Sequence, residues 1–262
     1  HVPPNLHARF TPVGSTDVEH LTYEKLADIV RKAWNISLDQ VDVIHHSPMC
    51  QSLSGATRDR TNHFAPDKIT PITTLARYHL RCLQSVFDIF RTLHKQRFGG
   101  VIHVENPQGG FTHLPDVQSM AALPGWRIIQ HANHCANTCH LDKHEYTAKP
   151  STYLVYNVRA DLQLRRCNND CPFRVEAHPT RHRWLIAQRG DARSFGQRVV
   201  RSVVSKGRVP FGIFKALWHG RRQSHDPSIV HDHAFAAMWR GRHTVTYNAL
   251  ACPSCHALTS VR

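Results

Sequence analysis

The sequence predicts an α/β fold in which short buried strands alternate with amphipathic helices. The first observation is a β-branched run from Asp42 to Ser47 that stops at Pro48, because proline supplies no donor to a sheet ladder. The second is an apolar run at 101–104 that ends at Glu105. Each run follows a segment with helical spacing of its apolar residues, and this order is typical of a doubly wound sheet.

The first expected helix spans residues 22–34. Its apolar residues recur at i, i+3, i+4, i+7 and i+8, and so line one face; they are Leu26, Ile29, Val30, Ala33 and Trp34. Asp17 precedes this helix, in a place where the helix macrodipole favours a carboxylate. A short linker then leads into the first strand.

Cys50 lies in the turn beyond that strand. In open parallel sheets ligands gather outside the carboxyl ends of the strands, so a cysteine there is placed to act as a nucleophile. The alternative for an isolated thiol is a buried structural cysteine. The second strand end carries the acid Glu105 and the amide Asn106 before Pro107, and this favours the nucleophile.

The segment at 52–70 is polar and is expected to be a loop. Its Arg58 and Arg60 are suited to bidentate contacts with phosphates. A surface loop of any basic protein has a similar composition, so this feature alone leaves both readings open.

A long helix is expected from Pro71 to Gly99-Gly100, with an apolar stripe along its whole length. His79 and Cys82 fall on this stripe and are predicted to pack in the core. The helix delivers the chain into the second strand.

Beyond the second strand, a short helix is expected at 116–123, followed by strands at 126–131 and 152–156. No helix-length amphipathic segment separates these two strands, so they are predicted to pair antiparallel. The composition then shifts toward arginine. We therefore predict three units: a core at 1–158, a basic Arg-rich extension at 159–220 and a tail at 221–262 whose structure is not predicted.

The charge balance favours a polyanionic partner, since Lys and Arg exceed Asp and Glu by 33 to 19 and give a formal net charge of +14. No run of about 18 apolar residues is present, and the sequence has no apolar core of a signal peptide. We expect an intracellular protein with no membrane contact. In such a chain, thiol chemistry or metal binding is a better reading of the eight cysteines than disulfides.

Cys167 and Cys171, with His178, have a spacing compatible with a structural zinc site. A second group, Cys252-x2-Cys255-His256, has compatible spacing as well, and Cys135 and Cys139 are further possible contributors. The spacing does not choose among these ligands, and unpaired cysteines are the alternative.

The two strand ends resemble the Pro-Cys and Glu-Asn motifs of cytosine-C5 DNA methyltransferases, most closely the short phage-like and mobile-element-like branch. The motifs read Ser-Pro-Met-Cys-Gln-Ser at 47–52 and Glu-Asn-Pro at 105–107. Further matches follow in the same order: His134-Cys135, Lys149-Pro150-Ser151-Thr152, Asn157, Cys167 and Cys171 with His178, and Arg208-Val209-Pro210 with Leu217. The matches span positions 42–217, and Met49 stands where the family has a second proline.

This resemblance implies a Rossmann-like methyltransferase sheet, incomplete at its N-terminus, with residues 1–158 as its catalytic core. The implied reaction transfers a methyl group from S-adenosylmethionine to C5 of cytosine in double-stranded DNA. Cys50 would attack C6 of the base, Glu105 would bind or protonate N3, and Asn106 would hold the strand end in shape. A base inside a duplex is out of reach, so it must be flipped into the site.

The resemblance implies that Asp17 and Pro48 bind the methyl donor. It places Arg58 and Arg60 in a flap that closes over DNA, and Lys149 at the DNA as well. It also implies a nuclear location if the source is a eukaryote.

The family's glycine-rich donor loop lies upstream of the strand that leads to Cys50, and residues 1–41 contain one expected helix and no such loop. Either a further N-terminal segment supplies it, or donor binding is lost. In the second case the protein is an inactive, nucleic-acid-binding relative of methyltransferases. A third reading, a zinc-binding interaction module, explains the cysteine-rich tail but not the two strand ends.

Overall fold

The computed structural model has an α/β fold, which confirms the predicted class. It describes residues 18–53, 63–139, 142, 150–168, 170–171 and 209–221, and the backbone alone at 174–175, 178–182 and 244–248. The main elements in chain order are α1 (Tyr23–Trp34), β1 (Val43–Ser47), α2 (Thr74–Lys95), β2 (Val101–Pro107), α3 (Pro115–Ala121), β3 (Trp126–Asn133), β4 (Pro150–Tyr156), β5 (Arg174–Val175), β6 (His178–His182), α4 (Phe211–His219) and β7 (Thr244–Asn248).

The central sheet is mixed and has the strand order β3-β4-β2-β1-β7. β1 runs parallel to β2 and to β7, whereas β4 runs antiparallel to β2 and to β3. The predicted antiparallel pairing of the strands at 126–131 and 152–156 is therefore confirmed. β5 and β6 form a separate two-stranded sheet.

Local chemistry explains where the helices begin and end. The first backbone N–H groups of a helix have no partner within the helix. At the starts of α1 and α2, the hydroxyl oxygens of Thr22 and Thr73 each accept a hydrogen bond from one of these N–H groups. α1 ends at Asn35, whose φ of 56° is the left-handed conformation that stops a helix. α2 ends at Lys95, before the glycine pair where the sequence predicted its end.

Gly100 is needed because two strands start close together there. A Cβ at Gly100 would lie 2.6 Å from the carbonyl oxygen of Val41, too close for any side chain. Asn157, in the left-handed region after β4, donates its amide N–H to the carbonyls of Gly99 and Gly100 at 2.9 and 3.1 Å. The start of β2 is thus fixed between β1 and the end of β4.

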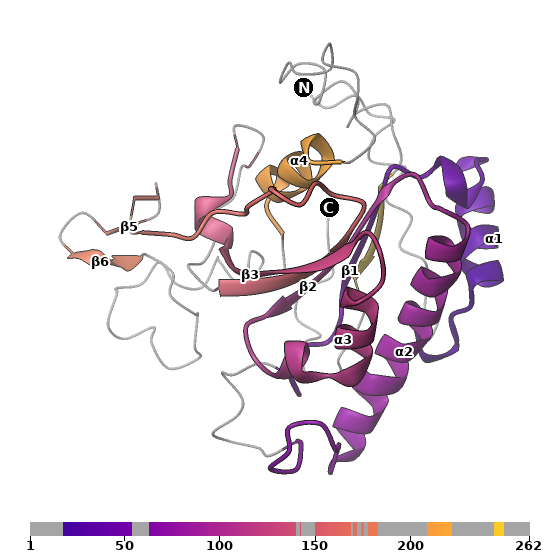
Figure 1. Cartoon of the computed structure of the whole chain (residues 1–262), viewed down its shortest axis with the longest axis horizontal. Coiled ribbons are helices and arrows are strands. Elements are labelled where there is room, and N and C mark those ends of the chain that lie inside the picture. Colours follow the sequence, from indigo (N-terminus) through magenta and orange to yellow (C-terminus); the bar gives the residue numbers. More distant parts are fainter. Residues whose placement is uncertain are drawn as a thin grey trace.

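The helices α1, α2 and α3 cover one face of the sheet (Figure 1). Their buried stripes meet Ile44 of β1, Ile102 and Val104 of β2 and Leu154 of β4 in the largest apolar cluster. His79 and Cys82 of α2 are 3% and 5% exposed, so the prediction that they pack in the core is confirmed.

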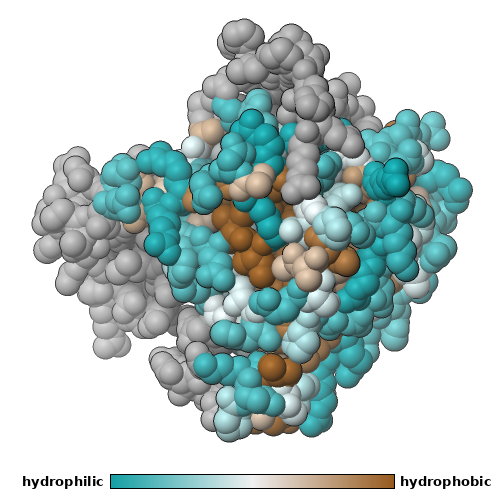
Figure 2. Space-filling model, in the orientation of Figure 1, coloured by the Kyte–Doolittle hydropathy of each residue, from teal (hydrophilic) through white to brown (hydrophobic). Residues whose placement is uncertain are grey.

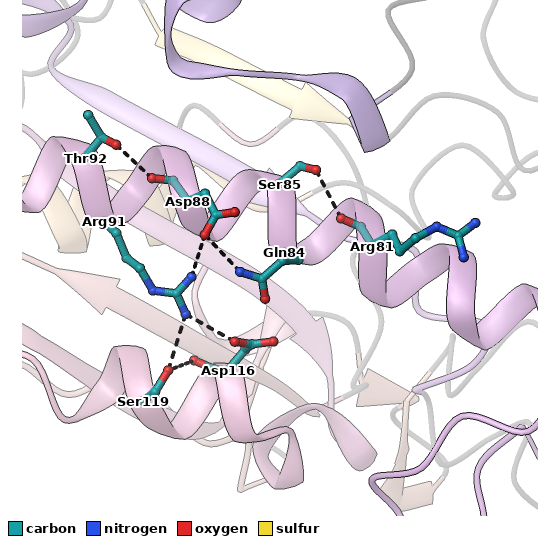
Figure 3. Close-up of polar contacts among 8 residues, drawn as sticks. All are labelled: Arg81, Gln84, Ser85, Asp88, Arg91, Thr92, Asp116 and Ser119. Carbon is teal, nitrogen blue, oxygen red and sulfur yellow. Dashed lines mark hydrogen bonds and ion pairs between the residues drawn. The ribbon is translucent and has the colours of Figure 1, made fainter.

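A polar seam joins α2 to α3 on the outside of this layer (Figure 3). The guanidinium group of Arg91 reaches Asp88 on its own helix at 2.8 Å and Asp116 of α3 at 3.2 Å. It also donates to the hydroxyl of Ser119 at 3.4 Å. Over the outer side of α1 the surface is mostly hydrophilic (Figure 2).

The helix α4 lies on the opposite face of the sheet (Figure 1). Ile213 and Leu217 pack against Val101 and Tyr153, and Phe214 packs against Val43. The carboxylate of Asp142 accepts the backbone N–H groups of Phe211 and Gly212, at 2.8 and 3.1 Å, and so caps the start of α4. α4, from the segment at 159–220, packs against the sheet, and β7, from the segment at 221–262, is the strand at one edge of that sheet.

Across the described residues, every helix is too short or too polar to span a lipid bilayer.

Candidate functional site

The site predicted from the sequence lies where β1 and β2 end side by side. The parallel register pairs His46 with Val104, which sets Ser47 beside Glu105. Cys50 follows three residues after Ser47, the last residue of β1. The predicted neighbourhood of the two strand ends is therefore confirmed, with the difference that β2 extends to Pro107 and includes Glu105 and Asn106.

Two serine hydroxyls hold the carboxylate of Glu105, which is 8% exposed. Ser151 of β4 donates to Oε1 at 2.6 Å, and Ser47 of β1 donates to Oε2 at 3.3 Å. Nε2 of His134 lies 3.7 Å from Oε1. Each carboxylate oxygen thus has a donor from a different strand, which fixes its orientation.

Two buried histidines extend this arrangement into the sheet. Nδ1 of His45 lies 3.2 Å from Nδ1 of His103, and Nε2 of His45 lies 2.9 Å from Oγ of Ser47. The edges of both rings meet Phe214 of α4, at centroid distances of 5.4 and 4.9 Å. Burial lowers the pKa of His103 to about 3. Burial also holds the pKa of His45 well below its ordinary value, and the neighbouring His103 lowers it further. Both rings are therefore neutral at pH 7.

When Glu105 is in its carboxylate form it determines the tautomers of the neighbouring histidines, because a carboxylate can only accept hydrogen bonds. If Ser47 donates to Glu105, the hydroxyl oxygen must accept from Nε2–H of His45. His45 then has a bare Nδ1, which accepts from Nδ1–H of His103. Nε2 of His103 is left as a buried acceptor with no hydrogen-bond partner among the described residues.

The turn that carries Cys50 is anchored on both sides. Its start is held by Asn106, whose amide donates to the carbonyl of Pro48 at 3.4 Å. Its end is held by Ser52, whose hydroxyl lies 2.7 Å from Nδ1 of His79 on α2. Burial lowers the pKa of His79 to about 4, so this contact is made with a neutral ring. Cys50 itself is partly exposed, as a nucleophile must be.

A second group of reactive side chains lies beyond β3 and β4. The thiol sulfurs of Cys135, Cys167 and Cys171 all lie within 4.8 Å of one another, and this group could hold a metal ion. Cys135 comes from a single 3-10 turn, His134–Ala136, directly after β3, and the other two follow β4. Burial, followed by the neighbouring Cys171 and Cys167, raises the pKa of the Cys135 thiol. As a free thiol Cys135 is thus protonated and is a poor nucleophile compared with the more exposed Cys50.

The structure joins Cys167 and Cys171 of the predicted metal set to Cys135. Cys139, which the sequence left as a possible contributor, is described and is not part of this group. Only the backbone of His178 is described. The predicted site residues Asp17, Arg58, Arg60 and Lys149 lie outside the described residues.

Sequence reasoning missed the side chains that surround Glu105. His45 and His103 are recognisable in retrospect, because they lie two residues before Ser47 and Glu105 and so share a strand face with them. The positions of Ser151 and His134 beside Glu105 depend on how β4 pairs with β2 and β3. A local sequence pattern does not contain that information.

Comparison with known proteins yields no match: no protein-family model fits this chain, and neither the curated proteins nor the solved structures include one with significant similarity to it.

Proposed function

We propose that this protein is a cytosine-C5 DNA methyltransferase in which Cys50 is the nucleophile and Glu105 the acid. The proposal is carried by one observation: β1, whose end precedes Cys50 by three residues, pairs in parallel with β2, which carries Glu105. The order of the strand-end motifs in the sequence supports the same reaction. The formal net charge of +14 supports DNA as the partner.

The chemistry needs both groups, because C5 of cytosine is a weak nucleophile. Addition of the Cys50 thiolate to C6, with transfer of a proton to N3 from Glu105, forms a C6–S bond and makes C5 electron-rich. C5 then takes the methyl group, for which S-adenosylmethionine is the proposed donor. Release of the C5 proton to solvent, return of the N3 proton to the Glu105 carboxylate and expulsion of the Cys50 thiolate then restore the aromatic ring and the free enzyme, and the demethylated donor is the second product.

Among the residues assigned to the donor, Pro48 lies in the described part of the chain. Pro48 is buried, and its carbonyl is bound by Asn106, so its role is to hold the turn beside Cys50 in one shape. Ser47 and Ser151 keep the carboxyl group of Glu105 pointing in a fixed direction. A carboxyl group held in one orientation and a nucleophile turn held in one shape favour a step that forms and breaks bonds at one base.

The experiment is covalent trapping on duplex DNA that carries 5-fluorocytosine, in the presence of S-adenosylmethionine. Fluorine cannot leave C5 as a proton, so the enzyme remains attached after methyl transfer. Both the given chain and a version with any residues encoded upstream of His1 are to be tested. Cys50→Ser should abolish the adduct, Glu105→Gln should slow it strongly, and the control Cys139→Ser should leave it unchanged. An adduct that survives Cys50→Ser would overturn the proposal.

DNA binding and zinc binding separate this proposal from its alternatives. Salt-sensitive binding to duplex DNA without any adduct would favour an inactive, nucleic-acid-binding relative. We also propose that the ion held by Cys135, Cys167 and Cys171 is zinc in a structural role. Zinc binding with neither DNA binding nor an adduct would favour an interaction module.

A further inference from the structure

We infer that a metal ion held by Cys135, Cys167 and Cys171 fixes the turn that carries His134 against Glu105. The metal centre would then support the wall of the candidate catalytic site, although it takes no part in the reaction. The inference rests on the proposed function only where it calls Glu105 catalytic. The link between the metal and Glu105 is a structural property with its own measurement.

Hydrogen bonds from two asparagine side chains hold the segments of Cys135 and Cys167 together. Asn133 and Asn137 flank the turn that carries Cys135, and both bind the segment that carries Cys167. Oδ1 of Asn133 accepts the N–H of Cys167 at 2.9 Å, and the amide of Asn137 donates to the carbonyl of Arg165 at 2.8 Å. Oδ1 of Asn137 accepts the N–H of Arg165 at 2.9 Å. Specific hydrogen bonds between the two segments therefore bring the thiols of Cys135 and Cys167 close together.

The distances suit a soft, tetrahedral ion. Zinc binds thiolates at about 2.3 Å, which puts the sulfurs of a tetrahedral site about 3.8 Å apart. The three sulfurs lie within 4.8 Å of one another, so side-chain rotations that move the sulfurs by about 1 Å would bring them to the spacing of a bound ion. Binding would release the thiol protons to solvent, and the ion's charge would compensate the buried thiolates. The sequence offers His178, seven residues after Cys171, as a candidate for the fourth ligand.

His134 carries the effect from the metal to Glu105. It is adjacent to Cys135 in the chain, and both residues are buried, at 4% and 0% exposure. Nε2 of His134 lies 2.9 Å from the hydroxyl of Tyr153 and 3.7 Å from Oε1 of Glu105. A ligand bond at Cys135 would therefore hold the His134 ring in place beside the carboxylate, in the way that outer groups position one another around metal sites.

The first experiment measures metal binding by the whole chain purified in reducing buffer. We expect one equivalent of zinc, and on replacement by cobalt an absorption band from sulfur-to-metal charge transfer. Cys135→Ser, Cys167→Ser and Cys171→Ser should each weaken binding by more than about tenfold, since even outer partners of a metal site contribute about that much. Cys139→Ser, in the same part of the chain, is the matched control and should bind normally.

A chain that binds no zinc, or whose Cys135→Ser variant binds it as tightly as Cys139→Ser, would overturn the assignment. So would a disulfide between two of the three cysteines in the protein as isolated. His178→Ala should weaken binding while His182→Ala should not. The opposite result would refute the fourth ligand alone.

The second experiment tests the link to Glu105 in the unaltered protein, so a variant that fails to fold cannot obscure it. Removal of zinc with a chelator should speed amide hydrogen exchange about tenfold or more at residues 133–137 and 150–153. Exchange in the middle of α2, on the other face of the sheet, should stay unchanged. Unchanged exchange at 133–137 and 150–153 after complete zinc removal would overturn the inference. This result does not depend on whether the trapping experiment yields an adduct, so the two proposals can fail separately.

Discussion

The two faces of the sheet differ in what they bury. The face under α1, α2 and α3 holds the largest apolar cluster, with Phe87 and Phe90 of α2 at 0% and 1% exposure. The face under α4 holds smaller apolar clusters and, toward the strand ends, the polar chain from His103 to Glu105. Strand alternation makes this division possible, because neighbouring residues of one strand face opposite sides.

The difference teaches that most of the apolar burial and the hydrogen-bonded chain of ionisable side chains lie on opposite faces of one sheet. Apolar burial on the first face stabilises the fold at any pH, although this face also holds the neutral ring of His79 of α2, whose pKa is lowered by burial to about 4. On the second face, buried ionisable groups are held by a few hydrogen bonds and reduce stability when they take up charge. The following predictions test that division.

The largest effect is expected in the apolar face. Phe87→Ala removes a fully buried ring between α2 and the sheet and should lower the free energy of unfolding by about 3–5 kcal/mol. Urea unfolding at pH 7 measures it. Ile72→Ala, at a side chain that is 48% exposed, is the control and should change stability by less than about 0.5 kcal/mol. A small effect of Phe87→Ala would mean that this face does not carry the stability.

The next effect concerns pH and the face under α4. The pKa of His103 falls from 6.5 to about 3 on folding, so below pH 6.5 the unfolded chain binds a proton that the folded chain does not. Stability is therefore complete above pH 6.5 and falls as the pH drops, by up to about 1.4 kcal/mol per pH unit for this residue alone. Urea unfolding from pH 7.5 to 4.5 should show this slope.

His103→Gln should reduce that slope by up to about 1.4 kcal/mol per pH unit, since glutamine does not titrate. His113→Gln, at an exposed residue, is the matched control and should leave the slope unchanged. Equal slopes in His103→Gln and in the unaltered protein would show that the ring of His103 is not buried in its neutral form.

A smaller effect is expected from the hydrogen bonds of Glu105. Ser151→Ala removes the donor 2.6 Å from Oε1 and should lower the free energy of unfolding by about 1.5–3 kcal/mol at pH 7, because a buried charge loses a partner. Ser119→Ala, at an exposed serine of α3 that accepts a long hydrogen bond of 3.4 Å from Arg91, should cost no more than about 0.5 kcal/mol. If the two variants are equally stable, Glu105 is not held as a buried carboxylate by Ser151.

The helices α1, α2 and α3 and the first two strands were predictable because their signals are local, whereas α4 was not predicted. The stripe from Leu26 to Trp34 and the stop at Ser47-Pro48 each lie within a few residues, and the structure has α1 and β1 there. The pairing of Ser151 with Glu105, 46 residues apart, depends on the antiparallel register of β4 with β2. No periodic pattern in one segment specifies that register.

The metal-binding group shows the same limit. The spacing of Cys167 and Cys171 was visible in the sequence, but their partner Cys135 belongs to a turn 32 residues earlier in the chain. The contacts of Asn133 and Asn137 with residues 165–167 select this partner over Cys139. The choice is made by backbone geometry, and so it required the fold.

The smallest effect should come from the polar seam between α2 and α3, on the outside of the apolar face (Figure 3). Arg91 is 29% exposed and reaches both Asp88 and Asp116, so it ties two helices rather than one. Arg91→Ala should lower the free energy of unfolding by about 0.5–1 kcal/mol at low salt, and by less in 1 M salt, because screening weakens a partly exposed ion pair.

Arg31→Ala is the matched control, since Arg31 is 72% exposed and pairs with Asp28 within a single helix at 2.8 Å. It should change stability by no more than about 0.5 kcal/mol. Arg91→Lys should recover part of the loss at most, because an ammonium group cannot span two carboxylates as a planar guanidinium does. If Arg91→Ala instead lowered the free energy of unfolding as much as Phe87→Ala, the stability of this face would depend on the polar seam as well as on its apolar interior. The contrast with the α4 face would then be weaker than the burial pattern indicates.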